Sequence, residues 1–175
     1  MLTDAQTTPS AQREGLLIVG LGNLLMRDEG VGVHVVCRLR DAFRWGPGVT
    51  LLDGGTAGIA LLDEVAQADE VWCIDAAKLD AHPGAMRWLG DEHVDASLGS
   101  GVSMHQLNMA DVLGYLELMD AMPRKVDLLA IVPERVETGT TLTPVLDATC
   151  RRAASAIAAR ARDAGFEVDF SRATS

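Results

Sequence analysis

The stretch GLGNLLMRDEGVG, residues 20–32, lies between a short apolar run and a longer amphipathic run. The apolar run, residues 16–19, predicts a buried strand, and residues 31–43 predict a helix with one apolar face. The residues between them predict a glycine-bearing turn that joins the strand to the helix. An acidic pair, Asp28 and Glu29, stands at the expected start of that helix.

The acidic pair has three possible interpretations. Asp28 is predicted to be the N-cap, and Glu29 would then lie in the first turn, where the helix dipole favours a carboxylate. An ordinary helix cap without chemistry would look the same. A dinucleotide-binding loop is the third possibility, because Gly20 and Gly22 follow a strand. It is disfavoured because Leu25 replaces the third glycine and the two acids would repel a pyrophosphate.

Length and composition predict one globular domain. The chain has 175 residues, of which 48% are hydrophobic, and a chain of this size buries roughly 70% of its unfolded surface. Residues 1–14 are polar and are expected to form a mobile tail, leaving 15–175 as a single domain. The 3 cysteines form no CxxC pair, which argues against a disulfide framework or a cysteine zinc site.

Charge and hydropathy restrict the partners. The net charge of −10 argues against nucleic acid, because binding to phosphates requires clustered cations. No apolar run approaches the ~20 residues of a membrane span. The first residues lack the basic and apolar regions of a signal peptide. We therefore expect no nucleic acid, no membrane and a cytoplasmic location.

Strand and helix patterns alternate along the chain. They predict an α/β fold in which helices cover both faces of a twisted, largely parallel, five-stranded sheet. The predicted strands are 16–19, 49–52, 70–74, 85–89 and 126–132. The predicted helices are 31–43, 58–66, one from Ser103 to before Pro123, and one from Thr143 to Ala164, with a further short edge strand at 166–170. Since ligands bind at the carboxyl ends of parallel strands, we expect the site there.

Three residues are candidate metal ligands: Glu29, Asp75 and His105. Glu29 and Asp75 follow predicted strands, and His105 would lie in the first turn of a helix, where the dipole keeps imidazole neutral. Two carboxylates and one imidazole suit a borderline ion such as zinc or nickel. A strand-end cap at Asp75 and a surface histidine remain possible. Asp53 is a candidate orienting residue or a simple turn acid.

Several blocks occur in the order typical of one enzyme family. The stretch at 20–32 closely resembles the opening motif of the hydrogenase maturation endopeptidases. The later blocks that resemble the family are Asp53-Gly54-Gly55-Thr56, Asp75-Ala76 with Pro83-Gly84, Ser103-x-His105-Gln106, and Pro133-Glu134 with Gly139, Leu142 and Thr143-Pro144. The resemblance spans residues 16–165, nearly the whole predicted domain.

The resemblance implies a function and a site. Members remove a C-terminal extension from the precursor of a nickel–iron hydrogenase large subunit after nickel insertion. Their metal-recognising Glu, Asp and His correspond to Glu29, Asp75 and His105, and their turn aspartate corresponds to Asp53. The nickel is presented by the substrate, and no tightly bound organic cofactor is expected.

Two other functions stay open at this point. Residues 17–23 are also similar to the start of the peptidyl-tRNA hydrolases, although the proline expected after Asn23 is absent and the charge is wrong for tRNA. A non-catalytic nickel-binding maturation factor could use the same three ligands.

Overall fold

The computed structural model describes residues 15–90 and 109–170. The predicted tail at 1–14 and the predicted helix start at Ser103 lie outside them. Strands and helices follow in the order β1 (Leu16–Leu21), η1 (Arg27–Gly30), α1 (Val31–Ala42), β2 (Arg44–Trp45), β3 (Val49–Gly55), η2 (Gly58–Leu61), α2 (Leu62–Gln67), β4 (Glu70–Ala76), β5 (Met86–Leu89), α4 (Met109–Leu118), β6 (Lys125–Ile131), α5 (Pro144–Asp163) and β7 (Val168–Asp169).

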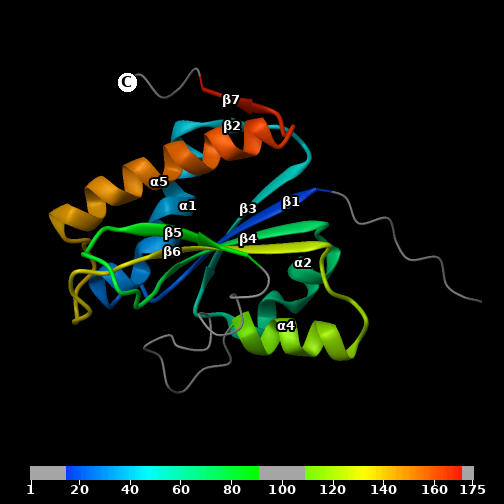
Figure 1. Ribbon diagram of the computed structural model, residues 1–175, viewed down its shortest axis with the longest axis horizontal. Coiled ribbons are helices and arrows are strands. Elements are labelled where there is room, and N and C mark those ends of the chain that lie inside the picture. Colours follow the sequence, from blue (N-terminus) through cyan, green and yellow to red (C-terminus); the bar gives the residue numbers. More distant parts are fainter. Residues whose placement is uncertain (1–14, 91–108, 171–175) are drawn as a thin grey trace, which may run out of the picture.

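The main sheet has five strands in the order β3-β1-β4-β6-β5 (Figure 1). β1 pairs in parallel with β3 and β4, and β4 pairs in parallel with β6. β5 is antiparallel to β6 and forms one edge. The predicted α/β fold with a largely parallel five-stranded sheet is confirmed.

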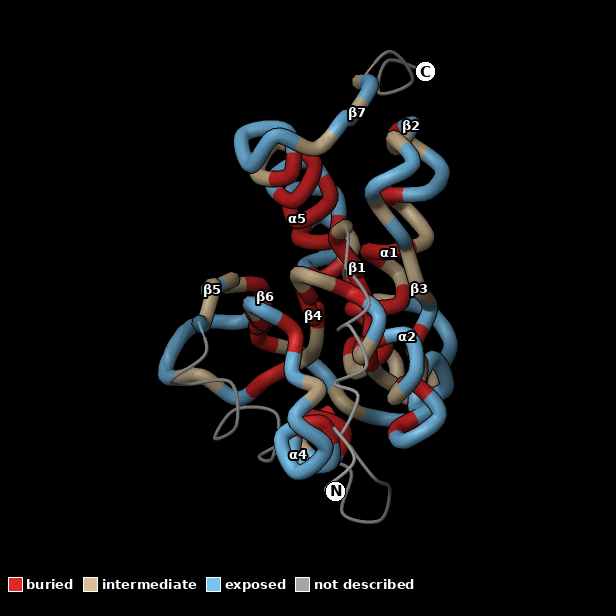
Figure 2. Tube along the Cα trace, turned by 90° about the vertical axis from the view of Figure 1, so that its right-hand side faces the viewer, coloured by how far each residue is buried: buried red, intermediate tan, exposed pale blue. Residues whose placement is uncertain are grey.

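Helices cover both faces of this sheet, as predicted. α1 and α5 pack on one face, in a core centred on Ile18, Val35, Leu39 and Ile157. α2 and α4 pack on the other face, where the core includes Leu116. Figure 2 shows that burial concentrates in the central strands and on the inner sides of α1 and α5. All of β1 is buried, because it lies mid-sheet between the two helical layers.

The segment after α5 differs from the prediction. Residues 166–170 were expected to add a short edge strand, but β7 pairs antiparallel with β2 in a separate two-stranded sheet. Aromatic packing holds this small sheet near α1, since the ring of Phe43 meets those of Trp45 and Phe170 edge-on. The pairing joins residues more than a hundred positions apart, so local sequence pattern does not predict it.

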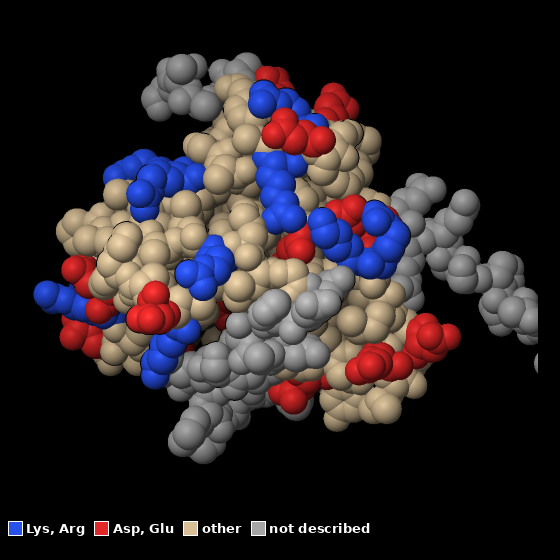
Figure 3. Space-filling view, viewed as in Figure 1, with Lys and Arg blue, Asp and Glu red and all other residues tan. Residues whose placement is uncertain are grey.

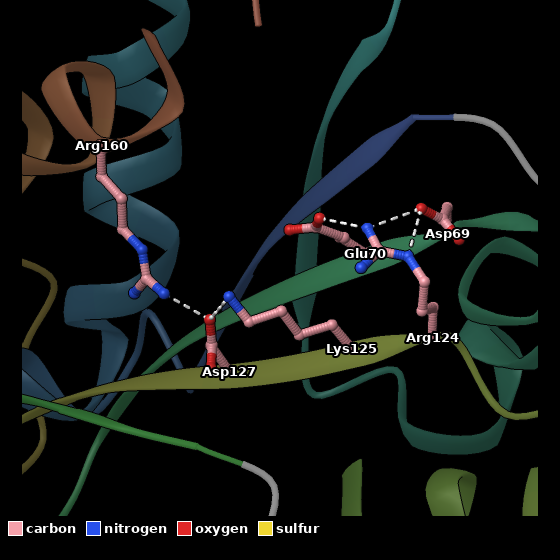
Figure 4. A network of polar contacts seen from close by, with 6 residues as sticks. All are labelled: Asp69, Glu70, Arg124, Lys125, Asp127 and Arg160. Carbon is pink, nitrogen blue, oxygen red and sulfur yellow. Dashed lines mark hydrogen bonds and ion pairs between the residues drawn. The ribbon is translucent and has the colours of Figure 1, made fainter. Parts of the chain in front are cut away.

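A charged network lies on β4, β6 and β5, the strands farthest from β3 in the sheet (Figure 4). Asp127 of β6 is buried and pairs with Arg160 of α5 and with Lys125, whose Nζ lies 3.2 Å from the carboxylate. The Arg160 guanidinium also packs against Trp72 and Trp88, 4.6 and 3.8 Å from their ring centroids. The network therefore links α5 to β4, β5 and β6.

Candidate active site

The site lies at the carboxyl ends of β1 and β4. The chain leaves β1 towards β3 on one side of the sheet, whereas from β4 it passes to β5 and then β6 on the other side. Adjacent strands whose connections diverge form a crevice at their carboxyl ends, where α/β proteins bind ligands. Glu29 follows β1 and Asp75 lies near the end of β4, so this topology places both predicted ligands beside one crevice.

Two glycines allow the turn after β1 to approach the sheet closely. A Cβ on Gly22 would lie 1.9 Å from the carbonyl oxygen of Glu29, and Gly22 has a φ of +120°. A Cβ on Gly32 would lie 2.1 Å from the carbonyl oxygen of Ile74. No side chain fits at either position. The glycine pattern therefore brings the segment that carries Glu29 against the end of β4, next to Asp75.

Glu29 lies in the short 3-10 turn η1. The sequence had predicted it in the first turn of α1, so that prediction is wrong. The N-cap of α1 is Gly30, without a side-chain cap. Glu29 is half-buried, and burial raises the pKa of its carboxyl group above the ordinary value of 4.5. The expected stabilisation of the carboxylate by the helix dipole is thus outweighed by lost hydration.

Asp75 has the more strongly perturbed carboxyl group. Burial raises its pKa from 3.8 to about 7. A hydrogen bond of 2.7 Å, donated by the Ala76 backbone N–H to Oδ1, opposes the rise, and the negative charge of Glu29 adds to it. The two predicted ligands are therefore close enough to repel one another.

The two site carboxylates, Glu29 and Asp75, have no compensating cation among residues 15–90 and 109–170. Neither acid forms an ion pair with a lysine or arginine there. That part of the chain also holds no group of three or more metal-ligating side chains, and His105, the third predicted ligand, lies outside it. Two half-buried carboxylates without a compensating cation favour a bound cation, because the cation relieves both desolvation and repulsion.

Asp53 lies near the end of the neighbouring strand β3, beside Gly20 of β1. Its side chain is exposed. Backbone groups make the hydrogen bonds of this turn, since Gly22 N–H donates to Gly55 O and Ala57 N–H donates to Gly54 O. The orienting role of Asp53 therefore stays a prediction.

The Asp28 carboxylate bonds to a distant segment of the chain, which the sequence did not predict. It is fully buried and caps neither η1 nor α1, so the predicted N-cap is wrong. Its carboxylate instead accepts hydrogen bonds from the backbone N–H groups of Glu134, Arg135 and Thr143 and from the Thr143 hydroxyl. These donors are 106 to 115 positions away in the chain. The only sequence signal was the acid itself.

Comparison with known proteins identifies the family. The sequence profile of hydrogenase maturation proteases matches residues 33–160. The chain is 38% identical over 154 residues to the hydrogenase 2 maturation protease of Escherichia coli K12, covering 87% of this chain and 93% of that protein. This chain belongs to the hydrogenase maturation protease family. It is therefore a peptide-bond hydrolase, and the alternative of a peptidyl-tRNA hydrolase is set aside.

Other relatives of this protease agree. HoxM of Azotobacter vinelandii, a hydrogenase expression/formation protein, is 40% identical over 70% of this chain and 59% of its own length. The solved hydrogenase maturating endopeptidase HybD from E. coli superposes with a TM-score of 0.82 at 37% identity, over 88% of this protease and 96% of HybD. The fold predicted from the resemblance is thereby confirmed.

Proposed function

We propose that this protease removes a C-terminal extension from the nickel-loaded precursor of a nickel–iron hydrogenase large subunit, and that Glu29, Asp75 and His105 recognise the nickel. The observation that carries the proposal is the pair of carboxylates, Glu29 and Asp75, that lies without a compensating cation at the carboxyl ends of β1 and β4. A nickel ion presented by the precursor would neutralise this pair. A precursor without nickel offers no such cation, so cleavage would follow metal insertion.

Two chemical roles are available to Asp75. As a nickel ligand it would be anionic, and the ion could polarise the scissile carbonyl or lower the pKa of a water molecule. Alternatively nickel only docks the precursor, and Asp75 accepts a proton from the attacking water, as in aspartic-type hydrolysis. A pKa of about 7 suits a general base near neutral pH. One carboxylate oxygen cannot fill both roles at the same moment, so the roles are separable.

The distribution of surface charge supports a protein partner over a nucleic acid. Figure 3 shows Lys and Arg interspersed with Asp and Glu on the face in view, without a continuous basic patch. No helix within the described ranges is long and apolar enough to span a membrane. Leu24 and Leu25, at 39% and 64% exposure, lie four or five positions before Glu29 and offer apolar contacts to a peptide chain. A cytoplasmic location remains part of the proposal.

Intact-mass spectrometry of a co-expressed hydrogenase large subunit tests the function. We expect the precursor to shorten only when both nickel and this protease are supplied. An unchanged mass with nickel bound would instead indicate a non-catalytic maturation factor. Shortening without nickel would refute metal recognition while leaving the protease activity intact.

The substitution Asp75→Asn separates the two roles of Asp75. Retained binding of the nickel-loaded precursor with lost cleavage indicates a general base. Lost binding indicates a nickel ligand. Asp41→Asn is the matched control, because Asp41 is an exposed acid near the end of α1 that lies away from Glu29.

A further inference from the structure

The buried carboxylate of Asp28 has no part in the proposed chemistry, yet it is the most fully hydrogen-bonded acid beside the site. Oδ2 accepts from Glu134 N–H at 3.0 Å, Arg135 N–H at 2.9 Å and the Thr143 hydroxyl at 3.0 Å. Oδ1 accepts from Thr143 N–H at 2.8 Å. One side chain thus joins η1 to two places on the segment 134–143.

Backbone contacts extend this junction. Arg27 N–H donates to Gly139 O at 2.8 Å, and Gly139 N–H donates to Leu25 O at 2.9 Å. The Arg27 Nε also lies 3.1 Å from Glu137 Oε1. Together with the Asp28 bonds, these contacts make a clamp between residues 25–28 and residues 134–143.

The clamp holds strained backbone. Arg27 has a φ of +48°, in the left-handed region that costs a non-glycine residue about 1 kcal/mol. Such a conformation persists only where surrounding contacts determine it, and it clusters at functional sites. Here Gly139 O accepts from the Arg27 N–H, and the adjacent Asp28 is bonded to residues 134–143.

Glu29 depends on this backbone for its position. Within the described residues its side chain makes no hydrogen bond or ion pair, and only its backbone is held, with the N–H donating to Met26 O at 3.2 Å. The carboxylate that would meet the nickel therefore points where η1 directs it. Asp28, the adjacent residue, fixes η1 against the segment 134–143.

We propose that Asp28 is a positioning residue, whose four hydrogen bonds to Glu134, Arg135 and Thr143 hold Glu29 in the orientation that recognises nickel. This inference rests on the proposed function. Replacing a residue that orients a metal ligand typically lowers metal affinity or activity by roughly 10- to 100-fold. A residue that only stabilises the fold would lower stability and leave nickel recognition unchanged.

Asp28→Asn is the direct test, because an amide cannot replace this carboxylate. With its oxygen at the Oδ2 position, the amide NH2 would face the Thr143 N–H. In the flipped orientation the NH2 would face the N–H groups of Glu134 and Arg135. Either way donor meets donor, and a buried donor is left unsatisfied.

The matched control is Asp127→Asn. Asp127 is also a buried acid that holds two segments together, but it lies in the Arg160 network on β6 and not in the clamp. Gly139→Ala is a second clamp variant that leaves Asp28 intact. Its Cβ would lie 2.8 Å from Cγ and 2.9 Å from Nε of Arg27, so the Arg27 side chain must move away from residue 139.

Each full-length variant is assayed at a temperature where circular dichroism shows it folded. We expect Asp28→Asn to lower kcat/KM on nickel-loaded precursor, and affinity for Ni²⁺ alone, by 10- to 100-fold, and Asp127→Asn to change both by less than 3-fold. Equal effects in the two variants, or wild-type Ni²⁺ affinity in folded Asp28→Asn, would overturn the proposal. If Asp28→Asn does not fold, Gly139→Ala decides by the same criteria.

Backbone ¹⁵N relaxation keeps this test independent of the proposed function. We expect Glu29 to be rigid in the wild type and in Asp127→Asn, and to gain mobility in a folded clamp variant. A Glu29 that stays rigid without the clamp would refute positioning even if the wild type proved to cleave nothing. Failure of the wild type to cleave, with Glu29 mobilised as expected, would count against the proposed function alone.

Discussion

The carboxyl group of Asp75 is expected to lower the stability of the free protease at neutral and alkaline pH. In the unfolded chain this group ionises near 3.8, whereas in the folded protein its pKa is about 7. The folded state therefore holds the proton more tightly, so the contribution of this group to stability is greatest below pH 3.8 and falls as the pH rises towards 7. Above pH 7 the loss is complete and constant.

The magnitude follows from the two pKa values. A tenfold change in proton affinity corresponds to about 1.4 kcal/mol, so the full loss is about 4 kcal/mol. At pH 5 roughly 1.5 kcal/mol of it is present, which leaves a change of about 2–3 kcal/mol between pH 5 and pH 8. Asp75→Asn removes the charge and keeps the oxygen that accepts from Ala76 N–H.

Urea unfolding of the wild type and of Asp75→Asn at pH 5 and pH 8 measures this effect. We expect the variant to be more stable than the wild type at pH 8, with an advantage that shrinks by about 2–3 kcal/mol at pH 5. An advantage of Asp75→Asn that is equal at both pH values, or a variant less stable at pH 8, would refute the reasoning about burial and Glu29.

Three further substitutions test the packing of the fold. Gly32→Ala places a Cβ 2.1 Å from Ile74 O and 2.4 Å from Leu21 O. We expect urea unfolding to show that the protein loses ~3 kcal/mol or more of stability. A loss below ~1 kcal/mol would contradict the close approach of α1 to the sheet. Thr143→Val removes a hydroxyl that donates to Asp28 and accepts from Leu146 N–H, and should cost about 2 kcal/mol in thermal or urea unfolding, whereas wild-type stability would rule out both roles. Arg160→Met leaves Asp127 with Lys125 alone and should cost about 2–4 kcal/mol with altered tryptophan fluorescence; an unchanged unfolding curve would mean that the network is dispensable.

The fold was predictable because its signals are local. Continuous apolar runs predicted β1, β4 and β6, and Thr143 before Pro144 predicted the start of α5, where the Thr143 side chain accepts from Leu146 N–H. The placement of Glu29 and Asp75 followed from a general property of parallel sheets. These inferences need only periodicity and the chain direction of each strand.

What the sequence did not predict depends on long-range pairing. The residues next to Asp28 predict a helix cap. In the structure its carboxylate instead accepts hydrogen bonds from donors more than a hundred positions away. β7 reads as an edge strand, yet its partner is β2 and not the main sheet. His105 lies outside the described residues, so the third predicted ligand stays a prediction.

Nickel titration of ¹⁵N-labelled protease tests the central claim most directly, because paramagnetic Ni²⁺ broadens the amide signals nearest to it. We predict that broadening begins at residues 28–30 and 75–77 and disappears in the double variant Glu29→Gln/Asp75→Asn, while diamagnetic Zn²⁺ shifts the same signals without broadening them. Broadening that instead centres on His34 or His82, and persists in the double variant, would contradict an acidic pair that receives the metal.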